Sequence, residues 1–341
     1  MDPLTHSLTG LFLGRAGLNR FSQQAPWILV LAANAPDIDI ATLAGGQLDY
    51  LNYHRHLTHS LAAWPVMALL PLFAVRLFTR RPFQWMGAYL ISLVAVASHL
   101  LLDYTNAYGV RFLLPFSGRW FRLDLTSVVD LWIWAVLLVA LAGPLIARLV
   151  NSEIGAHTKS SGRGFAIFAL LFLALYNGGR GVLHARAVAT LDSRIYAGAA
   201  PQRVAALPGP VNPLAWRGLV ETGEFYNVVN FSLLDEFDPS RGAIFYKAEA
   251  SAAIKAANNS PEFRDFFKFS QFPLERTVPL ADLENAVRVE AMDMRFGSPA
   301  QPRFVATADV NNRLQVIRSW FSFGAVGPAL SSAGTRPNTV Q

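Results

Sequence analysis

The chain has 341 residues, of which 52% are hydrophobic and only 15% charged, whereas soluble proteins average about 25% charged residues. This composition favours a membrane protein, and the absence of cysteine excludes disulfides and thiolate-bound metals. The net charge of +6 comes mainly from arginine, with 25 of the 29 basic residues, and it fits attraction to anionic lipid headgroups. The sequence has no basic stripe interleaved with aromatic residues, so we do not expect nucleic acid as a partner.

Two apolar segments near the N-terminus are too short or too broken to span a bilayer. We interpret residues 4–18 as a buried or interfacial helix and residues 26–35 as a half-membrane helix that ends at Pro36. Asp2 precedes the first basic residue, Arg15. Because a secretory signal begins with positive charge, we expect no cleavage of this segment.

Four later stretches have the length and apolar character of membrane spans. They are residues 61–78, 84–102, 128–150 and 165–183. The first carries Pro65 and Pro71, which predict kinks. The sequence therefore predicts four spans, or six if the two N-terminal segments also cross.

The pattern changes after His184 to alternating apolar and polar residues with β-branched and aromatic side chains. This predicts strands at residues 224–234, 286–296 and 313–320, and short helices at residues 248–258 and 261–267. The predicted fold is mainly α: a polytopic helical membrane domain followed by a small α+β soluble domain. The expected boundaries are residues 1–185, 186–327 and a disordered tail at 328–341.

Three segments carry histidine and aspartate in patterns that suit a metal ion. HRHLTHS, residues 54–60, holds His54, His56 and His59; NAPDIDI, residues 34–40, holds two aspartates; and His99 and Asp103 are four residues apart in an apolar helix. That last spacing puts both side chains on one helix face. Taken singly, these residues have simpler interpretations. His99 and Asp103 could be a hydrogen-bonded pair, and NAPDIDI could be a turn that ends a helix. His6, near the N-terminus, could be a core histidine.

Their coincidence favours the metal. If the spans alternate as predicted, all three segments lie on one membrane surface, where ionisable groups are costly and by default functional. Because cysteine is absent, His and Asp must supply the ligands, which suit a hard or borderline divalent ion; we expect one or two such ions, with zinc favoured. The candidate ligands in these segments are Asp37, His54, His59, His99 and Asp103, and a family resemblance adds His6.

The motifs MDPLTHSLTG, APDID, HRxLTHS and HLLLDYTNAYG, with Asp130 beyond them, resemble the YdjM-type family of inner-membrane metal-dependent hydrolases. The resemblance covers about residues 1 to 135. It implies a bacterial inner-membrane protein whose His and Asp residues hold the metal. His56 is a departure, because the family pattern has a small residue there, and we interpret it as a neighbour of the site.

A more distant similarity is to the zinc phospholipase C and single-strand nuclease superfamily. The shared order is an N-terminal His, an Asp, a His and an HxxxD, carried here by His6, Asp37, His59 and the pair His99 and Asp103. No later HxxxE or HxxxD follows to complete a three-metal cluster. One or two ions are therefore expected.

Other polar residues have supporting roles in this interpretation. We expect Arg55 to bind an anionic substrate group, with a lipid-headgroup anchor as the alternative. Asn106, Tyr108 and Asp130 are candidates to orient the ligands, and Asp124 and Asp130 either bind a metal or begin the third span.

These observations predict a membrane-embedded metal-dependent hydrolase, with a phosphoester, including a phospholipid, as substrate class. Asp37 or Asp39, whichever does not bind the metal, would be the general base. The alternative is a metal-binding membrane scaffold without catalysis. We expect a multi-pass protein of the bacterial inner membrane, in contact with lipid, with the site and C-terminal domain facing the periplasm.

Overall fold

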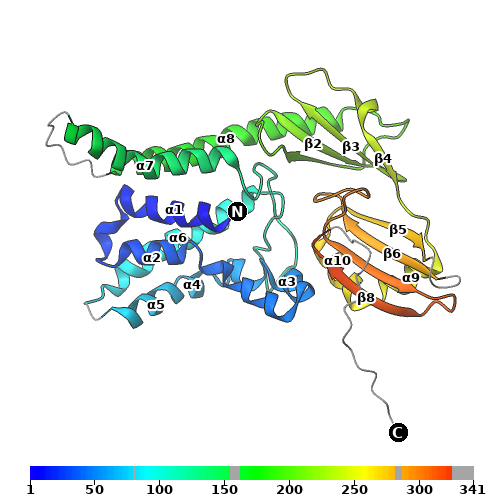
Figure 1. Cartoon of the computed structure of the whole chain (residues 1–341), viewed down its shortest axis with the longest axis horizontal. Coiled ribbons are helices and arrows are strands. Elements are labelled where there is room, and N and C mark those ends of the chain that lie inside the picture. Colours follow the sequence, from blue (N-terminus) through cyan, green and yellow to red (C-terminus); the bar gives the residue numbers. More distant parts are fainter. Residues whose placement is uncertain (80–81, 154–161, 281–285, 325–341) are drawn as a thin grey trace, which may run out of the picture. The chain divides into compact units, whose positions relative to one another are not determined.

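The computed structural model describes residues 1–79, 82–153, 162–280 and 286–324 (Figure 1). Contacts divide the chain into two compact units. The N-terminal unit comprises Met1–Ala44 and Asn52–Tyr246, and the C-terminal unit comprises Gly45–Leu51 and Lys247–Gln341.

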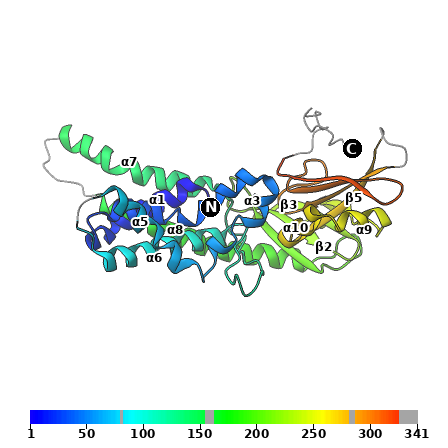
Figure 2. The same cartoon turned by 90° about the horizontal axis from the view of Figure 1, so that it is seen from below.

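Helices build most of the N-terminal unit (Figure 2). The α-helices are α1 (Pro3–Ala16), α2 (Ala25–Ala32), α4 (Trp64–Met67), α5 (Leu70–Phe78), α6 (Trp85–Thr105), α7 (Leu131–Glu153) and α8 (Arg163–Asp192). Three 3-10 helices connect them: η1 (Leu18–Phe21), η2 (Ala35–Gly45) and η3 (Leu57–His59). Helix α3 (Gln47–Tyr53) begins in the C-terminal unit and ends in the N-terminal one.

Helix α1 starts at a side-chain cap and crosses α2 at close range. The carboxylate of Asp2 accepts a hydrogen bond from Thr5 N at 3.0 Å, and Pro3 occupies the first turn, where its missing N–H costs nothing. At the crossing, a Cβ on Gly10 would lie 2.5 Å from the carbonyl oxygen of Leu29. Only glycine therefore allows this approach, which brings α1 against the helix that leads into NAPDIDI.

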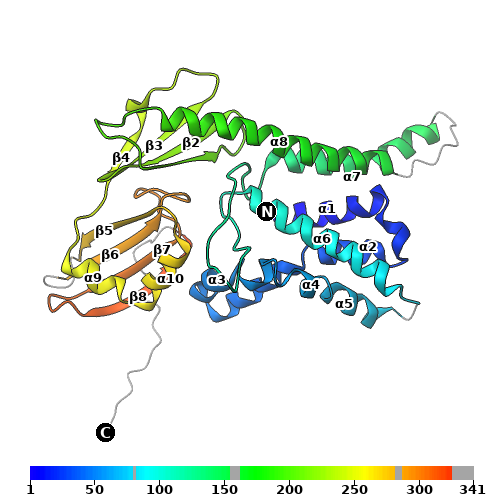
Figure 3. The same ribbon diagram turned by 180° about the vertical axis from the view of Figure 1, so that it is seen from behind.

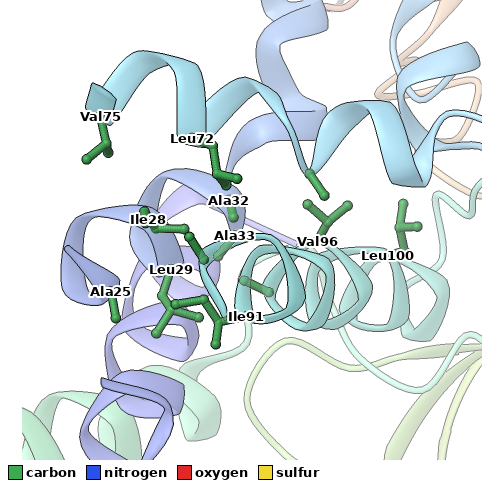
Figure 4. Close-up of a cluster of buried hydrophobic side chains, with 13 residues drawn as sticks. Ala25, Ile28, Leu29, Ala32, Ala33, Leu72, Val75, Ile91, Val96 and Leu100 are labelled. Atoms are coloured by element: carbon green, nitrogen blue, oxygen red, sulfur yellow. The ribbon is translucent and has the colours of Figure 1, made fainter. Parts of the chain in front are cut away.

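A hydrophobic core joins α2, α5 and α6. Figure 4 shows Ile28 and Leu29 of α2 pointing toward Leu72 of α5 and Ile91 of α6. All four side chains are buried, and their close packing holds the three helices together. The core fixes α2 and α6, the two helices that carry or precede the predicted metal ligands.

Three helices in the described part of the chain are long and apolar enough to cross a membrane: α6, α7 and α8. They match the second, third and fourth predicted spans. The first predicted span is broken into α4 and α5, because Pro65 and Pro71 each begin a new helix. The number rises to five if two bent helix pairs, one of them containing α4 and α5, each count as a span.

Helices α7 and α8 form an antiparallel hairpin, seen in Figure 3, and α8 continues to a four-stranded antiparallel sheet. The strands are β1 (Arg203–Pro208), β2 (Ala215–Glu221), β3 (Phe225–Ser232) and β4 (Ala243–Tyr246), paired in that order. Ala187 and Leu191 of α8 pack on Trp216 and Val229 of the sheet. The sheet is thus attached to the last turns of a membrane-length helix.

The C-terminal unit is a second antiparallel sheet covered by two helices. Strands β5 (Pro273–Pro279), β6 (Val287–Asp293), β7 (Val305–Val310) and β8 (Val316–Ser322) pair in order. Helices α9 (Ala252–Asn258) and α10 (Pro261–Phe269) pack on β6, β7 and β8. Phe263, Phe266 and Phe269 are three residues apart on α10 and buried, so one helix face supplies the core.

The predicted fold class is confirmed: helices with membrane-length spans precede a region of strands and short helices. The three predicted strands are β3, β6 and β8, and the two predicted helices are α9 and α10. Strands β1, β2, β4, β5 and β7 were not predicted. The boundary at residue 185 falls within α8 and stays a prediction, and the predicted tail at 328–341 lies outside the described residues.

Asp309 on β7 lies between two guanidinium groups. Its carboxylate accepts hydrogen bonds from Arg288 on β6, at 2.8 and 3.1 Å, and from Arg318 on β8. Burial raises the pKa of this carboxyl, but the hydrogen bonds from both arginines outweigh burial and hold the pKa below its usual range. The ion pairs therefore stabilise the folded unit only while Asp309 is ionised.

We predict that Asp309→Asn lowers the melting temperature of the detergent-purified protein at pH 7, and that this difference shrinks in acid. An unfolded Asp titrates at about pH 3.9, so the stabilisation is fully present above that pH and is lost as pH falls through the lower folded pKa. Thermal melts between pH 7 and pH 3 measure it, with the exposed Asp235→Asn as control. A difference that stays constant with pH would contradict this role.

Candidate metal centre

Four ligand groups converge inside the N-terminal unit. His99 and Asp103 come from the last turns of α6, His59 from η3 and Asp37 from η2. One ligand atom of each lies within 4.8 Å of all the others. The side chains of His59, His99 and Asp103 are fully buried, whereas that of Asp37 is 21% exposed. The cluster is thus closed on three sides and reachable at Asp37.

The backbone fixes the tautomer of His99. Its Nδ1 lies 2.7 Å from the carbonyl oxygen of Ala33, at the end of α2. A carbonyl oxygen only accepts hydrogen bonds, so Nδ1 carries the proton and the neutral ring presents a bare Nε2 to the cluster.

Asp39 fixes the tautomer of His59 in the same way. The Nδ1 of His59 lies 3.2 Å from Asp39 Oδ2 and 3.0 Å from the hydroxyl oxygen of Thr58, which itself donates to Asp39 Oδ2 at 2.9 Å. Both neighbours therefore accept from Nδ1. A carboxylate behind a metal-binding histidine is the usual means of orienting the ring and raising its basicity.

The distances from each histidine nitrogen to the other three ligand atoms are close to the edges of a tetrahedral metal site. The Nε2 atoms of His59 and His99 are 3.1 Å apart. Asp37 Oδ1 is 3.5 and 3.6 Å from these two nitrogens, and Asp103 Oδ2 is 3.3 Å from each. For metal–ligand bonds of about 2.0 to 2.1 Å, the edges of a tetrahedron measure about 3.3 to 3.4 Å. Each of these four atoms has a lone pair that it can donate to an ion at the centre of the group.

The two carboxylate oxygens of Asp103 have different neighbours. Oδ2 faces the histidines, while Oδ1 accepts from Arg55 Nη2 at 2.8 Å and contacts the amino group of Met1. His6 stacks on His99 with ring centroids 3.8 Å apart, and its Nε2 lies 3.4 Å from Asp103 Oδ1. Both ring nitrogens of buried His6 have no hydrogen-bond partner in the described chain, but His6 belongs to neither ligand group, and its role as a ligand stays a prediction.

Asp39 joins the two halves of the site. Its Oδ2 also accepts from Arg55 N at 2.9 Å, and its Oδ1 lies 2.9 Å from Nδ1 of His54. Arg55 adopts a left-handed backbone conformation, with φ of 53°, which L-residues rarely take and which aims its N–H at the carboxylate. Asp37, Asp39 and His54 form a second group that could hold an ion, and Asp37 belongs to both groups.

The other predicted residues are placed as follows. Asn106 Oδ1 accepts from Arg55 Nη1 at 3.1 Å, and the Tyr108 ring lies 4.8 Å below the Arg55 guanidinium. Asp130 instead accepts from Trp132 N and Ile133 N at the start of α7 and from the Tyr176 hydroxyl.

Asp124 pairs with Arg122, and His56 belongs to neither ligand group. Arg55 itself donates to Asp103, Asn106 and the carbonyl of Gly109. Its predicted contact with substrate stays a prediction.

Three supporting groups escaped the sequence analysis: the hydroxyl of Thr58 and the carbonyls of Ala33 and Gly109. The position of Thr58 directly before His59 was a usable signal, because a hydroxyl there can reach the ring. The two carbonyls had none, since any residue provides one.

Fold and site together define a helical membrane protein with a buried His/Asp cluster suited to a metal ion. The chain belongs to the YdjM inner membrane protein family, whose model matches residues 1–187. The cluster and the membrane-length helices α6 and α7 lie within this range, as does all of α8 except its last residues.

Among curated proteins, the chain is similar to the uncharacterized protein YfhP of Bacillus subtilis (strain 168). The two are 32% identical over 153 residues, which cover 42% of this chain and 46% of that protein. The match thus spans less than half of either protein. No solved structure matches the chain, and the similarity to zinc phospholipase C stays a prediction.

We predict that His59→Ala reduces the bound divalent metal of the purified protein to about a tenth of wild type or less, because it removes one of four ligands. His56→Ala, three residues away in the same motif, is the matched control and should retain the metal. Elemental analysis of both variants and of His99→Ala measures this. Equal metal in wild type and His59→Ala would refute the assigned centre.

Proposed function

We propose that this protein is a membrane-embedded, metal-dependent hydrolase of phosphoesters. The carrying observation is that two proton-free imidazole nitrogens converge with two carboxylate oxygens, each nitrogen lying 3.1 to 3.6 Å from the other three atoms. A shared proton satisfies at most one pair of these acceptors. A divalent cation accepts all four lone pairs, which supports a metal over a hydrogen-bonded cluster.

The donor set supports zinc, because imidazole and carboxylate ligands in a tetrahedron are the ones this ion prefers. When bound, such an ion supplies hydroxide at neutral pH and draws charge from a phosphoryl oxygen. One ion would use the four convergent ligands, with His6 beside them. A second would use Asp39 and His54 and share Asp37 with the first.

The reactive side of the centre is the one with exposure. Asp37 is 21% and His54 13% exposed, and both lie toward the second ligand group. His54 Nδ1 lies 2.9 Å from Asp39 Oδ1. With a single ion, Asp37 would bind the metal and Asp39 would be left as the general base.

Exposed apolar residues surround the ligands and support a lipid substrate. They alternate with ligands along the chain: Ile38 and Ile40 flank Asp39, and Leu57 and Leu61 flank His59, all four exposed. Exposing these four apolar side chains to water is unfavourable, whereas contact with the acyl chains of a bilayer is favourable. A phospholipid could hold its headgroup ester at the metal with its chains against these residues.

A metal-binding scaffold without catalysis is the alternative, and the complete burial of three ligands favours it. Structural zinc sites are closed, whereas catalytic sites keep an open position. We favour catalysis because Asp37 is partly exposed, which leaves one side of the cluster open.

We predict that the zinc-loaded protein hydrolyses phospholipids in mixed micelles, and that His99→Ala lowers the rate to the uncatalysed background. Ile40→Ser with Leu57→Ser should slow lipid hydrolysis by about tenfold or more while sparing a soluble short-chain phosphoester, because each loses buried contact with an acyl chain. Phosphate or headgroup release measures both. A metal-loaded wild type that turns over no phosphoester would favour the scaffold.

The proposed location is the bacterial inner membrane, crossed several times, with the site facing the periplasm. Basic residues in short loops bias those loops to the cytoplasm. Arg80 and Arg81 lie outside the described residues, in the short stretch of sequence between α5 and α6, and belong to none of the site motifs. Arg55 and Arg111 lie in or beside the site on the opposite side, where they bind protein acceptors.

We predict that a cysteine at Ser117 is labelled by an impermeant thiol reagent in intact cells, whereas a cysteine at Thr79 is not. The native chain has no cysteine, so each variant carries a single target. Ser117 lies in the loop after α6, and Thr79 directly follows α5. Labelling at Thr79 alone would place the metal centre in the cytoplasm.

A further inference from the structure

Arg111 is a buried cation that has no carboxylate partner in the described part of the chain. Its side chain is 7% exposed. Its Nη2 donates to the carbonyl oxygen of Asn52 at 3.0 Å, and its Nε is buried without a hydrogen-bond partner among the described residues. Arg55, by contrast, is paired with Asp103. A buried charge without a counter-charge is costly, and an anionic ligand would offset that cost.

The backbone holds Arg111 next to the segment that carries two of the histidine ligands. Val110 and Phe121 exchange two hydrogen bonds, N to O in each direction, both of 2.8 Å. On the other side, Leu61 N donates to the carbonyl oxygen of Phe112 at 3.0 Å. Leu61 directly follows the HRHLTHS motif. Arg111 therefore lies on a short stretch of chain that is bonded both within its own loop and to the end of that motif.

Two aromatic rings connect Arg111 to the second ligand group. The guanidinium of Arg111 lies over the Trp120 ring, 4.6 Å from its centroid. The Trp120 ring meets the Tyr108 ring at 5.8 Å, and Tyr108 meets the His54 ring at 5.5 Å, both edge to face. Asn52, whose carbonyl Arg111 binds, precedes His54 by two residues, which span at most about 7 Å. Arg111 is thus held near His54, on the exposed side of the centre.

Arg55, the arginine that the sequence favours for substrate binding, is already engaged by the protein. Its guanidinium donates to Asp103, to Asn106 and to the carbonyl of Gly109, at 2.8 to 3.1 Å. It lies over the Tyr108 ring, as Arg111 lies over the neighbouring Trp120 ring. Of these two guanidinium groups, both in the N-terminal unit, the one that lacks a carboxylate in the described chain is that of Arg111.

We propose that Arg111 binds a phosphate oxygen of the substrate while the ester bond lies at the metal centre. The inference deepens the proposed hydrolase function and rests on it. A planar guanidinium matches phosphate with parallel N–H donors, and the face of Trp120 holds that plane in position. Arg111 is then a specificity residue: it selects anionic substrates by binding them, and the chemical step belongs to the metal centre.

The test is binding of inorganic phosphate to the zinc-loaded, full-length protein in detergent, measured by isothermal titration calorimetry. Arg111→Gln should raise the phosphate Kd about tenfold or more, because charge-assisted hydrogen bonds are lost, and should retain zinc like wild type. Arg111→Lys keeps the charge without the planar donors, so its Kd should lie between the two. Arg119→Gln is the matched control: Arg119 is an exposed arginine of the same loop, and its loss should leave the Kd unchanged.

Two further measurements separate the source of the phosphate from a structural effect. A short-chain phosphatidic acid should bind more tightly than inorganic phosphate and show the same dependence on Arg111, if the natural ligand is a lipid phosphate. With a soluble phosphomonoester as substrate, Arg111→Gln should raise KM by the factor found for phosphate and leave kcat near the wild-type value. A general loss of structure would lower kcat as well.

Wild-type phosphate affinity in Arg111→Gln, with zinc retained, would overturn the role of Arg111 and leave the hydrolase proposal intact. Loss of zinc from Arg111→Gln would also overturn it, since the residue would then support the metal centre. So would an equal loss of affinity in Arg119→Gln, because the effect would come from the charge of the loop. A wild type that binds phosphate through Arg111 but hydrolyses no phosphoester would instead refute the hydrolase and uphold the phosphate contact.

Discussion

The proton-free Nε2 atoms of His59 and His99 lie 3.1 Å apart in the interior of an apolar helical unit, and the rest of the site depends on this constraint. Two lone pairs at this distance repel each other unless a cation lies between them. Each ring is held there by a hydrogen bond that its Nδ1 donates, to the carbonyl of Ala33 or the carboxylate of Asp39. The arrangement is costly by itself, so an ion bound there would couple metal binding to local folding.

Packing between the helices positions the groups that surround the two histidines. Gly10 lets α1 approach α2, and this contact places His6 against His99. The packing of α2 on α6 places the Ala33 carbonyl at the His99 ring. Because these contacts are made by closely packed, buried residues, the ligands have little room to move.

Asp39 connects several polar groups of the site through its hydrogen bonds. It orients His59, binds His54 and holds the backbone of Arg55, whose guanidinium in turn neutralises Asp103. The carboxylates of the site thus differ in role although their sequence contexts are alike. Asp37 and Asp39, two residues apart, face different partners: one the histidine nitrogens that point inward, the other the groups behind them.

The sequence by itself determined the membrane character, the order of the main spans and the segments of the site. Apolar length fixes the spans, helical periodicity pairs His99 with Asp103, and prolines at positions 65 and 71 break the first span. Only the tertiary structure decided which of the clustered histidines converge, that Asp130 caps α7, and that residues 45–51 group with the C-terminal unit. The physical reason is that spans and pairs follow from local geometry, whereas ligand convergence depends on helix crossings and on contacts between residues far apart in the chain, such as His99 and Ala33.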